Sequence, residues 1–531
     1  MSTTQQTERP SPARWVLVIS LLGLGAGLAS SLLATVVMGV LLFAVGAPTP
    51  VELFGSYVLK HLDVYTFVKL LITFSPNSKT TPLGLAFLAM LGIGTLLGAF
   101  YALVARVPLP AAGYCPGRRE WICGLGLGLG MAIVGIVLFR DELRHNQYGL
   151  TVGWSSLVTS LSLLVEFGIY GVTLCFALRA LLPKEHSPET PAELQKRRQF
   201  FSRTGVAVVG LASGVGVVGL LRAYLDQYSS YDGMKTLQHG EKTAPITPND
   251  DHYIVTQNTV DPAPSISLWR LEVGGLINKA GSYTYEEVQK LPSISRAITL
   301  ECISNGPGGR LMGTAIWQGV TLKALLEQHG GAKPEATHVA FYSVDGYNVS
   351  LPLRELLEAD TLLAWRMNGQ EIPQRHGFPM RVLVPGRYGE ENAKWVTRVE
   401  LTNHFVTGLY SSQGWYNGPL HSTSRIDTPR GKVSVGQAVE VSGVAYAGDR
   451  EVKKVEVSTD GAQTWQEATI KTRLSPDAWV LWTWQWVPQK PGRYILVCRL
   501  TNGDDEVQTG NKQGTVPNGS TGYHEVVVQA V

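Results

Sequence analysis

The segment HGFPMRVLVPGRYGEENAKW, residues 376–395, joins a short strand-like run to several side chains that can carry chemistry. Its run 380–384 predicts a β-strand, and glycine, proline and charged residues surround it. Taken singly, His376 could close a turn before a glycine, and Arg381 could pair with a surface carboxylate. The segment therefore has to be interpreted together with the rest of the chain.

The chain divides into two halves of different composition. Its 531 residues exceed the roughly 250 to 300 at which one hydrophobic core usually stops growing, so more than one domain is expected. Residues 1–224 are poor in acids and dense in Leu, Gly and Val, whereas the remainder has an ordinary soluble composition. The net charge of +3 comes without a long basic block, so no nucleic-acid partner is expected.

The first half predicts an all-α membrane region with about five transmembrane helices. A helix needs about 17 to 20 apolar residues to cross the hydrocarbon core, and the fifth run is the weakest because it is short and glycine-rich. Buried helices of a soluble protein are the alternative, which the scarcity of internal charge disfavours; Glu166 is the one central exception. No histidine lies inside the runs, which disfavours a bis-histidine haem between the helices. The runs are 15–45, 83–104, 121–139, 152–182 and 205–220.

Lysine and arginine near the ends of these runs predict the orientation of the region. They are concentrated on the side of the N-terminus, so this side is expected to be cytoplasmic and everything after Tyr224 extracytoplasmic. Before the fifth run, KRRQFFSRTG (196–205) has the pattern of a twin-arginine export signal, which suits a domain that crosses the membrane already folded around a cofactor. The alternative is the positive flank of an ordinary span.

The second half predicts two further domains after a polar linker at 225–250. Short strands at 268–273, 338–342 and 380–384 alternate with helical patterns at 285–290 and 322–328, which indicates an α+β domain at 251–416. From 417 to 531, alternating runs separated by turn residues predict a β-sandwich. Trp482, Trp484 and Trp486 share one strand face there and are expected in its core rather than on a ligand platform.

Cys302, in TLECISNGPGG (299–309), is the most informative of five cysteines. Cys498 alternates with leucines and is expected to be a core residue, although a disulfide between Cys302 and Cys498 stays open. Cys302 has no CxxC partner and no HxxxH motif nearby, which argues against a zinc or iron–sulfur site built from protein ligands alone. One thiolate can still hold a metal if a cofactor supplies the remaining donors. The other three, which belong to the membrane half, are Cys115, Cys123 and Cys175.

Several ordered motifs resemble the sulfite oxidase family of molybdopterin enzymes. Residues 376–395 resemble its HGxPxRxxxPGxxGxxxxKW signature, and WQGVTLKALL (317–326) and LLAWRMNGQEIP (362–373) precede it in the family's order. ECISN (301–305) falls where the family places its metal-bound cysteine, and VEVSTDGAQTW (455–465) resembles part of its immunoglobulin-like dimerisation domain. The resemblance covers about 251–531 and implies a sulfite-oxidase-like molybdopterin-binding domain followed by an immunoglobulin-like β-sandwich.

The resemblance also implies roles for individual residues. Cys302 would be the metal ligand, giving its thiolate to molybdenum beside the pterin dithiolene, and would be catalytic. Arg381 would bind the pterin phosphate by a charge-assisted fork. Tyr416 falls near the family's active-site tyrosine and is the second catalytic candidate. The cofactor-binding candidates are Tyr253, Asn258, Cys302, Asp345, His376, Arg381, Asn392 and Lys394.

Three departures from the family pattern bear on the substrate. Thr256 and Gln257 stand where sulfite oxidases have the arginine that helps hold their anionic substrate, and SNGP at 304–307 replaces Gly-Asn-Arg-Arg. Glu390 and Glu391 replace an Ala-Arg stretch. Fewer cations near the metal would weaken the attraction for a dianion such as sulfite.

The sequence thus predicts a multi-pass, membrane-anchored molybdenum-molybdopterin oxidoreductase that transfers oxygen atoms on a small molecule outside the cytoplasm. Sulfite-type oxidation and sulfoxide or N-oxide reduction both stay open. A separate electron carrier (a quinone, a cytochrome or a membrane redox protein), the lipid bilayer and a second copy bound through the C-terminal domain are the expected partners. The alternatives are a non-catalytic membrane receptor on the same scaffold and, because of Glu166, a transporter.

Overall fold

The computed structural model describes residues 11–74, 80–185, 191–225 and 242–531. The chain forms two compact units, which are described one at a time. The first comprises Met1–Leu59, Lys69–Gln147 and Val152–Tyr228, and the second comprises Lys60–Val68, Tyr148–Thr151 and Ser229–Val531. Most of the predicted linker, 226–241, lies outside the described residues.

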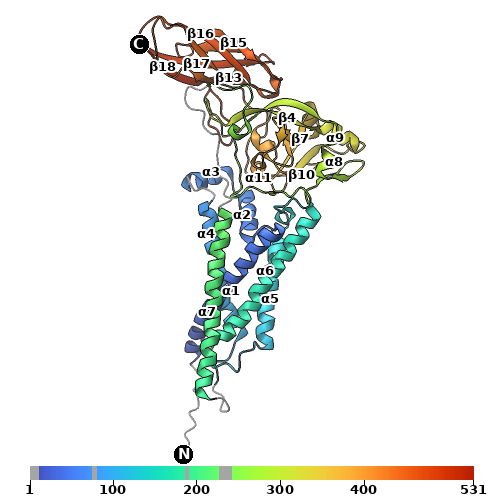
Figure 1. Cartoon of the computed structure of the whole chain (residues 1–531), viewed down its shortest axis with the longest axis vertical. Helices are drawn as coiled ribbons and strands as arrows, with labels where there is room; N and C mark the ends of the chain where they lie inside the picture. The colour runs from blue at the N-terminus through green and yellow to red at the C-terminus, as the bar shows by residue number, and fades with distance from the viewer. Residues whose placement is uncertain (1–10, 75–79, 186–190, 226–241) are drawn as a thin grey trace, which may run out of the picture. The chain divides into compact units, whose positions relative to one another are not determined.

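The first unit is built from long apolar helices that lie alongside one another (Figure 1). By length and composition, five helices of the described residues could cross a membrane, which confirms the five predicted apolar helices. Four of them begin before their apolar run because flanking residues join the helix, whereas α6 begins at the start of its run and ends one residue short of its end. KRRQFFSRTG, for example, lies wholly inside α7. The five are α1 (Pro12–Val45), α4 (Thr80–Ala105), α5 (Arg118–Leu138), α6 (Val152–Leu181) and α7 (Ala192–Leu225); shorter helices are α2 (Pro50–His61), α3 (Val64–Thr73) and η1 (Glu142–Arg144).

Helices α1 and α4 pack through small residues. A Cβ atom on Gly27 of α1 would lie 2.8 Å from the carbonyl oxygen of Gly94 in α4, and one on Gly98 would lie 2.5 Å from the Cα atom of Gly27. Such backbone-to-backbone contact is how apolar helices associate where water supplies no driving force. Larger side chains at these glycines would push the two helices apart.

The second unit begins with one mixed sheet, one antiparallel sheet and short helices. One sheet has the order β2-β1-β10-β5-β6, and the other has β3-β4-β7-β8 with β9 paired to β7. Buried tryptophans, among them Trp269, Trp365 and Trp395, fill the main core. This mixture of strands and helices confirms the predicted α+β class. The strands are β1 (Leu271–Gly275), β2 (Gly281–Tyr283), β3 (Ile294–Glu301), β4 (Met312–Thr321), β5 (His338–Ser343), β6 (Asn348–Pro352), β7 (Leu362–Met367), β8 (Gln370–Glu371), β9 (Arg381–Leu383) and β10 (Val396–Thr402). The helices are η2 (Asn249–Asp251), α8 (Tyr285–Val288), α9 (Leu322–Gln328), α10 (Leu353–Glu358), η3 (Gln374–His376), η4 (Gly389–Glu391) and α11 (Leu409–Ser412).

The C-terminal part of the second unit is a β domain, drawn in orange and red in Figure 1. Its eight strands pair in the order β11-β13-β16-β15-β14-β17-β18-β12. Trp482 and Trp486 lie in its core and Trp484 packs against it half-buried, as expected for one strand face. The elements are β11 (Thr423–Thr428), β12 (Gly431–Val433), β13 (Val439–Tyr446), η5 (Gly448–Arg450), β14 (Val452–Ser458), β15 (Gln466–Thr472), β16 (Val480–Trp486), β17 (Gly492–Asn502) and β18 (His524–Ala530).

Cys498 is fully buried in the core of this β domain. Both it and Cys302 are free thiols, so the alternative of a disulfide between them is wrong. Cys302 is therefore available for another role.

Candidate active site

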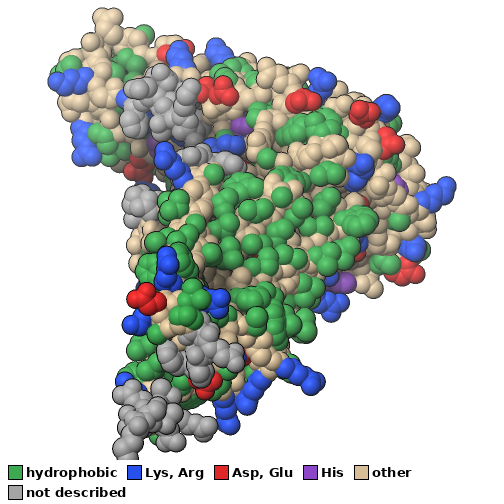
Figure 2. All heavy atoms as spheres, turned by 60° about the horizontal axis from the view of Figure 1, so that its bottom comes forward, with side chains coloured by type: hydrophobic (Ala, Val, Ile, Leu, Met, Phe, Trp, Pro, Cys, Tyr) green, Lys and Arg blue, Asp and Glu red, His purple; other side chains and the backbone are tan. Residues whose placement is uncertain are grey.

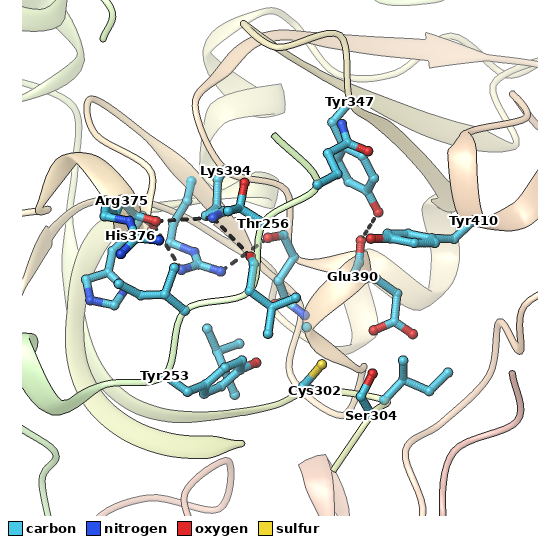
Figure 3. A pocket seen from close by; sticks show the side chains of 18 of the residues that line it. Tyr253, Thr256, Cys302, Ser304, Tyr347, Arg375, His376, Glu390, Lys394 and Tyr410 are labelled. Atoms are coloured by element: carbon cyan, nitrogen blue, oxygen red, sulfur yellow. Dashed lines mark hydrogen bonds between the residues drawn. The ribbon is translucent and has the colours of Figure 1, made fainter. Parts of the chain in front are cut away.

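A cavity in the second unit, with about 830 Å³ of free space when its open mouth is included, gathers most of the predicted site residues (Figure 3). Its walls come from loops rather than from the middle of strands. Cys302 follows β3, His376 ends η3, Arg381 opens β9, and Lys394 precedes β10. The functional side chains thus lie at or near the ends of strands, and the connecting loops form the walls of the cavity.

The loop after β3 holds Cys302 in place. The backbone N–H of Cys302 donates to the carbonyl of Leu311 (2.9 Å), and its own carbonyl accepts from Asn305 (2.8 Å). The Asn305 side chain donates to Glu301 Oε1 (2.8 Å) and accepts from the Leu311 N–H (2.9 Å). Gly308 has φ +78° and packs against His524, so a side chain there would be strained and would clash.

The Cys302 thiol is buried, with 6% of its surface exposed. Burial raises its pKa to about 12, and the nearby Glu390 carboxyl adds to this effect. A thiolate at this position therefore needs a metal cation to stabilise it.

Two cations face the same cavity without a carboxylate partner. Among the described residues, neither Arg381 nor Lys394 forms an ion pair. The Arg381 guanidinium donates to the carbonyls of His376 (3.0 Å) and Asn392 (3.2 Å), while its Nε has no partner in the described part of the chain. Lys394 Nζ donates to the carbonyls of Val255 (3.3 Å) and Arg375 (3.1 Å).

Burial makes these charges unfavourable in the absence of a ligand. It lowers the pKa of Arg381 to about 10 and that of Lys394 to about 7. It also lowers the pKa of His376 to about 2, and the neighbouring His252 acts in the same direction. Buried cations without paired carboxylates are the arrangement expected where a bound anion completes the site.

Polar side chains on the opposite wall hold the loops. Asn258 Nδ2 donates to Asp345 Oδ2 (2.8 Å), and the Tyr347 N–H donates to Asp345 Oδ1 (3.1 Å). The Asn392 amide accepts from the Val384 N–H (2.7 Å) and donates to the Tyr388 carbonyl (2.7 Å). Asn392 thus fixes the turn that carries Lys394.

The structure brings together seven of the predicted site residues. Asn258 is not in the cavity wall but contacts it through Asp345. Tyr416 also lies outside the wall: its hydroxyl donates to the Pro419 carbonyl (3.0 Å), and its ring stacks on His421 at 5.2 Å. Its catalytic role stays a prediction. The seven that line the cavity are Tyr253, Cys302, Asp345, His376, Arg381, Asn392 and Lys394.

Sequence reasoning missed an aromatic wall. Tyr347, Tyr410 and Trp415 line the cavity, with Tyr410 and Trp415 rings 4.5 Å apart and Tyr347 and Tyr410 rings 5.9 Å apart. Tyr347 could have been noticed because it follows Asp345 by two residues. Tyr410 and Trp415 come from α11 and the turn after it, where no periodic pattern marks them.

Glu390 is the residue of the cavity whose surroundings are most unusual. Neither of its carboxyl oxygens has a hydrogen-bond partner among the described residues, and burial together with Glu391 raises its pKa well above the usual range. In Figure 3 its carboxyl points toward Cys302 and Ser304. Glu391 is different because Arg387 lies 3.6 Å away, although burial still raises its pKa to about 8.

Comparison with known proteins agrees with this arrangement. The family profile described as "Oxidoreductase molybdopterin binding domain" matches residues 258–410, and "Mo-co oxidoreductase dimerisation domain" matches 419–488. The sulfite oxidase of Gallus gallus is 30% identical over 318 residues, covering 50% of this chain and 68% of that protein. The mitochondrial sulfite oxidase of Mus musculus is 30% identical over 343 residues, covering 54% of this chain and 62% of its own length.

More distant similarities include a plant enzyme and a solved structure. Nitrate reductase [NADH] 1 of Phaseolus vulgaris is 27% identical over 311 residues, covering 47% of this chain and 34% of that protein. The sulfane dehydrogenase SoxCD of Paracoccus pantotrophus has 22% identity and a TM-score of 0.47, covering 54% of this chain and 82% of that chain.

The two profiles define the class: the chain contains a molybdopterin-binding domain of the kind found in oxidoreductases, followed by the associated dimerisation domain. More narrowly, it belongs to the sulfite oxidase family. The cavity fits the molybdenum cofactor of that family, because it offers one buried thiol for the metal and buried cations that lack a carboxylate. The chain spans about 62% of the length of the mouse enzyme.

Proposed function

We propose that the chain is a membrane-anchored oxidoreductase that transfers an oxygen atom between water and a small substrate outside the cytoplasm. The observation that carries the proposal is the shared cavity of Cys302, Arg381 and Lys394. When bound, the molybdenum cofactor supplies the two-electron exchange and the oxygen-atom transfer. Cys302 would bind the metal through its thiolate.

The remaining residues of the cavity would bind and orient the cofactor. Arg381 and Lys394 would neutralise its phosphate, and His376 would contact the pterin. Tyr253 and Asp345 would line the pterin slot, with Asn258 and Asn392 holding the loops on either side. Tyr416 is proposed as a second catalytic residue. Its hydroxyl would contact the substrate only after the turn that carries it moves toward the cavity.

The carboxyl of Glu390 favours an uncharged substrate. Thr256, Gln257 and Glu390 stand where cations would be needed to attract sulfite, so reduction of a sulfoxide or an N-oxide is the preferred reaction. Each turnover would consume two electrons and two protons and release the reduced compound and one water. The aromatic wall of Tyr347, Tyr410 and Trp415 would pack against the substituents of such a substrate. Sulfite-type oxidation is the second candidate.

The proposed organisation follows the predicted domain limits. Residues 1–224 would anchor the protein in the cell membrane, with 225–250 as a linker, 251–416 as the cofactor-binding domain and 417–531 as an immunoglobulin-like dimerisation domain. The excess of Lys and Arg on one side of the helices supports an extracytoplasmic catalytic domain. The residues 196–205 would act as a twin-arginine export signal. A homodimer, the bilayer and a separate electron carrier complete the proposed partners.

Metal analysis and electron paramagnetic resonance (EPR) test the proposal. Full-length protein from a host that makes the cofactor should contain about one molybdenum per chain, and a sulfoxide or N-oxide should change its EPR signal. Cys302→Ser should alter that signal and abolish turnover, whereas Cys498→Ser, a buried thiol in the β domain, serves as the matched control. Molybdenum far below one per chain would instead favour the non-catalytic receptor. Full turnover of Cys302→Ser with an unchanged signal would refute the proposed site.

A further inference from the structure

The helical unit contains a large apolar cavity of its own. It has about 1050 Å³ of free space, its open mouth included, and is lined by α1, α2, α4, α5 and α6, all within the first unit. Its walls are mainly methionine, phenylalanine and small residues, which leave room for a flat or flexible apolar ligand. The larger apolar side chains of the wall are Met38, Met90, Met131, Phe54 and Phe167.

Two buried polar groups in this wall lack partners. Glu166 of α6 is 4% exposed, and its Oε2 atom has no hydrogen-bond partner among the described residues. Ser31 of α1 is 7% exposed, and its Oγ atom is likewise unpartnered in the described structure. By contrast, the buried Glu120 of α5 pairs with Arg179 at 2.9 Å. Glu166 and Ser31 are therefore not explained by the packing of the helices alone.

Ser31 and Tyr170 of the wall converge on Gly94, and Glu166 lies one helical turn from Tyr170. Glu166 and Tyr170 are four residues apart on α6 and share a face, and the Tyr170 hydroxyl donates to the Gly94 carbonyl of α4 (2.6 Å). A Cβ atom on Gly94 would lie 2.1 Å from Ser31 Oγ and 3.7 Å from the Tyr170 ring, so both side chains converge over this glycine. The wall thus combines a few polar groups with a larger number of apolar side chains.

Its open side is lined by apolar residues. Phe54 and Ile93 belong to the wall and are 51% and 57% exposed. Figure 2 shows that hydrophobic side chains gather in a broad continuous area on one face of the molecule. In a bilayer these exposed residues would meet lipid, so a ligand would enter from the hydrocarbon phase.

We propose that this cavity binds a membrane quinone or quinol, with the ring oxygens hydrogen-bonded to Glu166 and Ser31 and the isoprenoid tail along the methionine and phenylalanine wall. A phospholipid acyl chain would fill the apolar part but would leave both polar groups unsatisfied. A protonated Glu166 carboxyl and the Ser31 hydroxyl can donate to the carbonyls of a quinone, and the ionised Glu166 carboxylate can accept from a quinol hydroxyl.

The choice of a quinone also rests on the proposed function, which requires a separate two-electron carrier. Oxidation of one quinol to its quinone releases two electrons and two protons. Reduction of one sulfoxide or N-oxide to the reduced compound and water consumes the same number of each. The carrier and the substrate therefore balance without a further reactant.

Direct binding of a short-tail ubiquinone tests the site. Full-length protein in quinone-free lipid nanodiscs should bind radiolabelled decylubiquinone saturably, above the uptake of protein-free nanodiscs. Glu166→Leu should weaken binding at least about tenfold, because it removes the carboxyl that, when protonated, would donate to a quinone carbonyl. Thr159→Val is the matched control: this α6 hydroxyl is also buried and unpartnered among the described residues but does not line the cavity, so binding should be unchanged.

A second, cavity-filling variant keeps the test valid if Glu166→Leu fails to fold. Ala86→Phe places bulk in the wall and should weaken binding similarly, whereas Leu88→Phe, on the same helix but outside the wall, should not. Uptake no greater than that of empty nanodiscs, or unchanged binding by both Glu166→Leu and Ala86→Phe, would overturn the proposal. Protein made in molybdate-free medium should bind equally well, so failure of the quinone site is distinguishable from failure of the molybdenum chemistry.

Discussion

Replacing Lys394 with methionine should stabilise the cofactor-free protein and weaken its hold on the cofactor. Burial lowers the pKa of Lys394 from 10.5 to about 7, which corresponds to about 5 kcal/mol of disfavoured charge at about 1.4 kcal/mol per pKa unit. Methionine would remove this penalty but also the two hydrogen bonds to the carbonyls of Val255 and Arg375, worth about 1 kcal/mol each. The expected net gain in the free energy of unfolding at pH 7 is therefore about 1 to 3 kcal/mol.

The effect should depend on pH with a definite sign. Between pH 7 and 10.5 the unfolded chain keeps the lysine proton that the folded chain releases, so the stability of the cofactor-free protein should rise with pH across this window. The penalty is complete below the folded pKa of about 7 and absent above 10.5. In Lys394→Met this contribution to the pH dependence should be missing.

Thermal unfolding of the full chain in detergent would measure these differences. Protein from cofactor-deficient and cofactor-competent hosts should be compared at pH 7 and 9.5, with the exposed Lys333→Met as control. In the loaded protein, loss of a charge-assisted bond of about 1.5 to 3 kcal/mol should weaken cofactor retention by about 10- to 100-fold, read as molybdenum remaining after dialysis. If Lys394→Met lowered the melting temperature of both forms equally, Lys394 would be structural and the anion-site reasoning wrong.

Other changes address the substrate pocket, the β domain and the helical unit. Glu390→Arg should raise kcat/KM for sulfite relative to a neutral sulfoxide by about tenfold or more, measured with an artificial electron acceptor or donor; an unchanged ratio would remove Glu390 from substrate selection. Trp482→Ala, in the core of the β domain, should cost about 3 to 5 kcal/mol, seen as a lower unfolding midpoint, whereas Trp465→Ala on the half-exposed surface should cost much less. Gly27→Leu should separate α1 from α4 and reduce the yield of folded protein extracted from membranes, unlike Gly92→Leu, whose Cβ meets nothing within 4 Å.

Much of the architecture could be predicted because it depends on local patterns. Five long apolar runs predict five helices, and the alternation around Trp482 predicts a strand with one buried face. The exact ends could not be predicted in this way. α7 extends back through the basic residues 196–203 because Lys, Arg and Gln favour a helix as well as an apolar run does.

The site was predictable only where a motif carries it. Cys302, His376, Arg381 and Lys394 stand in ordered motifs, and all four line one cavity. Tyr410 and Trp415 reach the same cavity from a turn that no pattern connects to it, because long-range packing rather than sequence spacing brings them there. Tyr416 is the opposite case. Its position in the sequence predicted that it would lie in the active site, but its ring stacks on His421 and does not line the cavity.

The single thiol of the cavity has a consequence for how the protein acquires its metal. Among the described residues, no three His, Cys, Asp or Glu side chains gather closely enough to capture a bare ion, and Arg381 and Lys394 would repel one. Free zinc or copper ions, which bind tightly to a cluster of thiolates, should therefore have low affinity for this cavity. The metal would therefore be selected when the pterin cofactor is assembled, and the polypeptide would bind the complete cofactor.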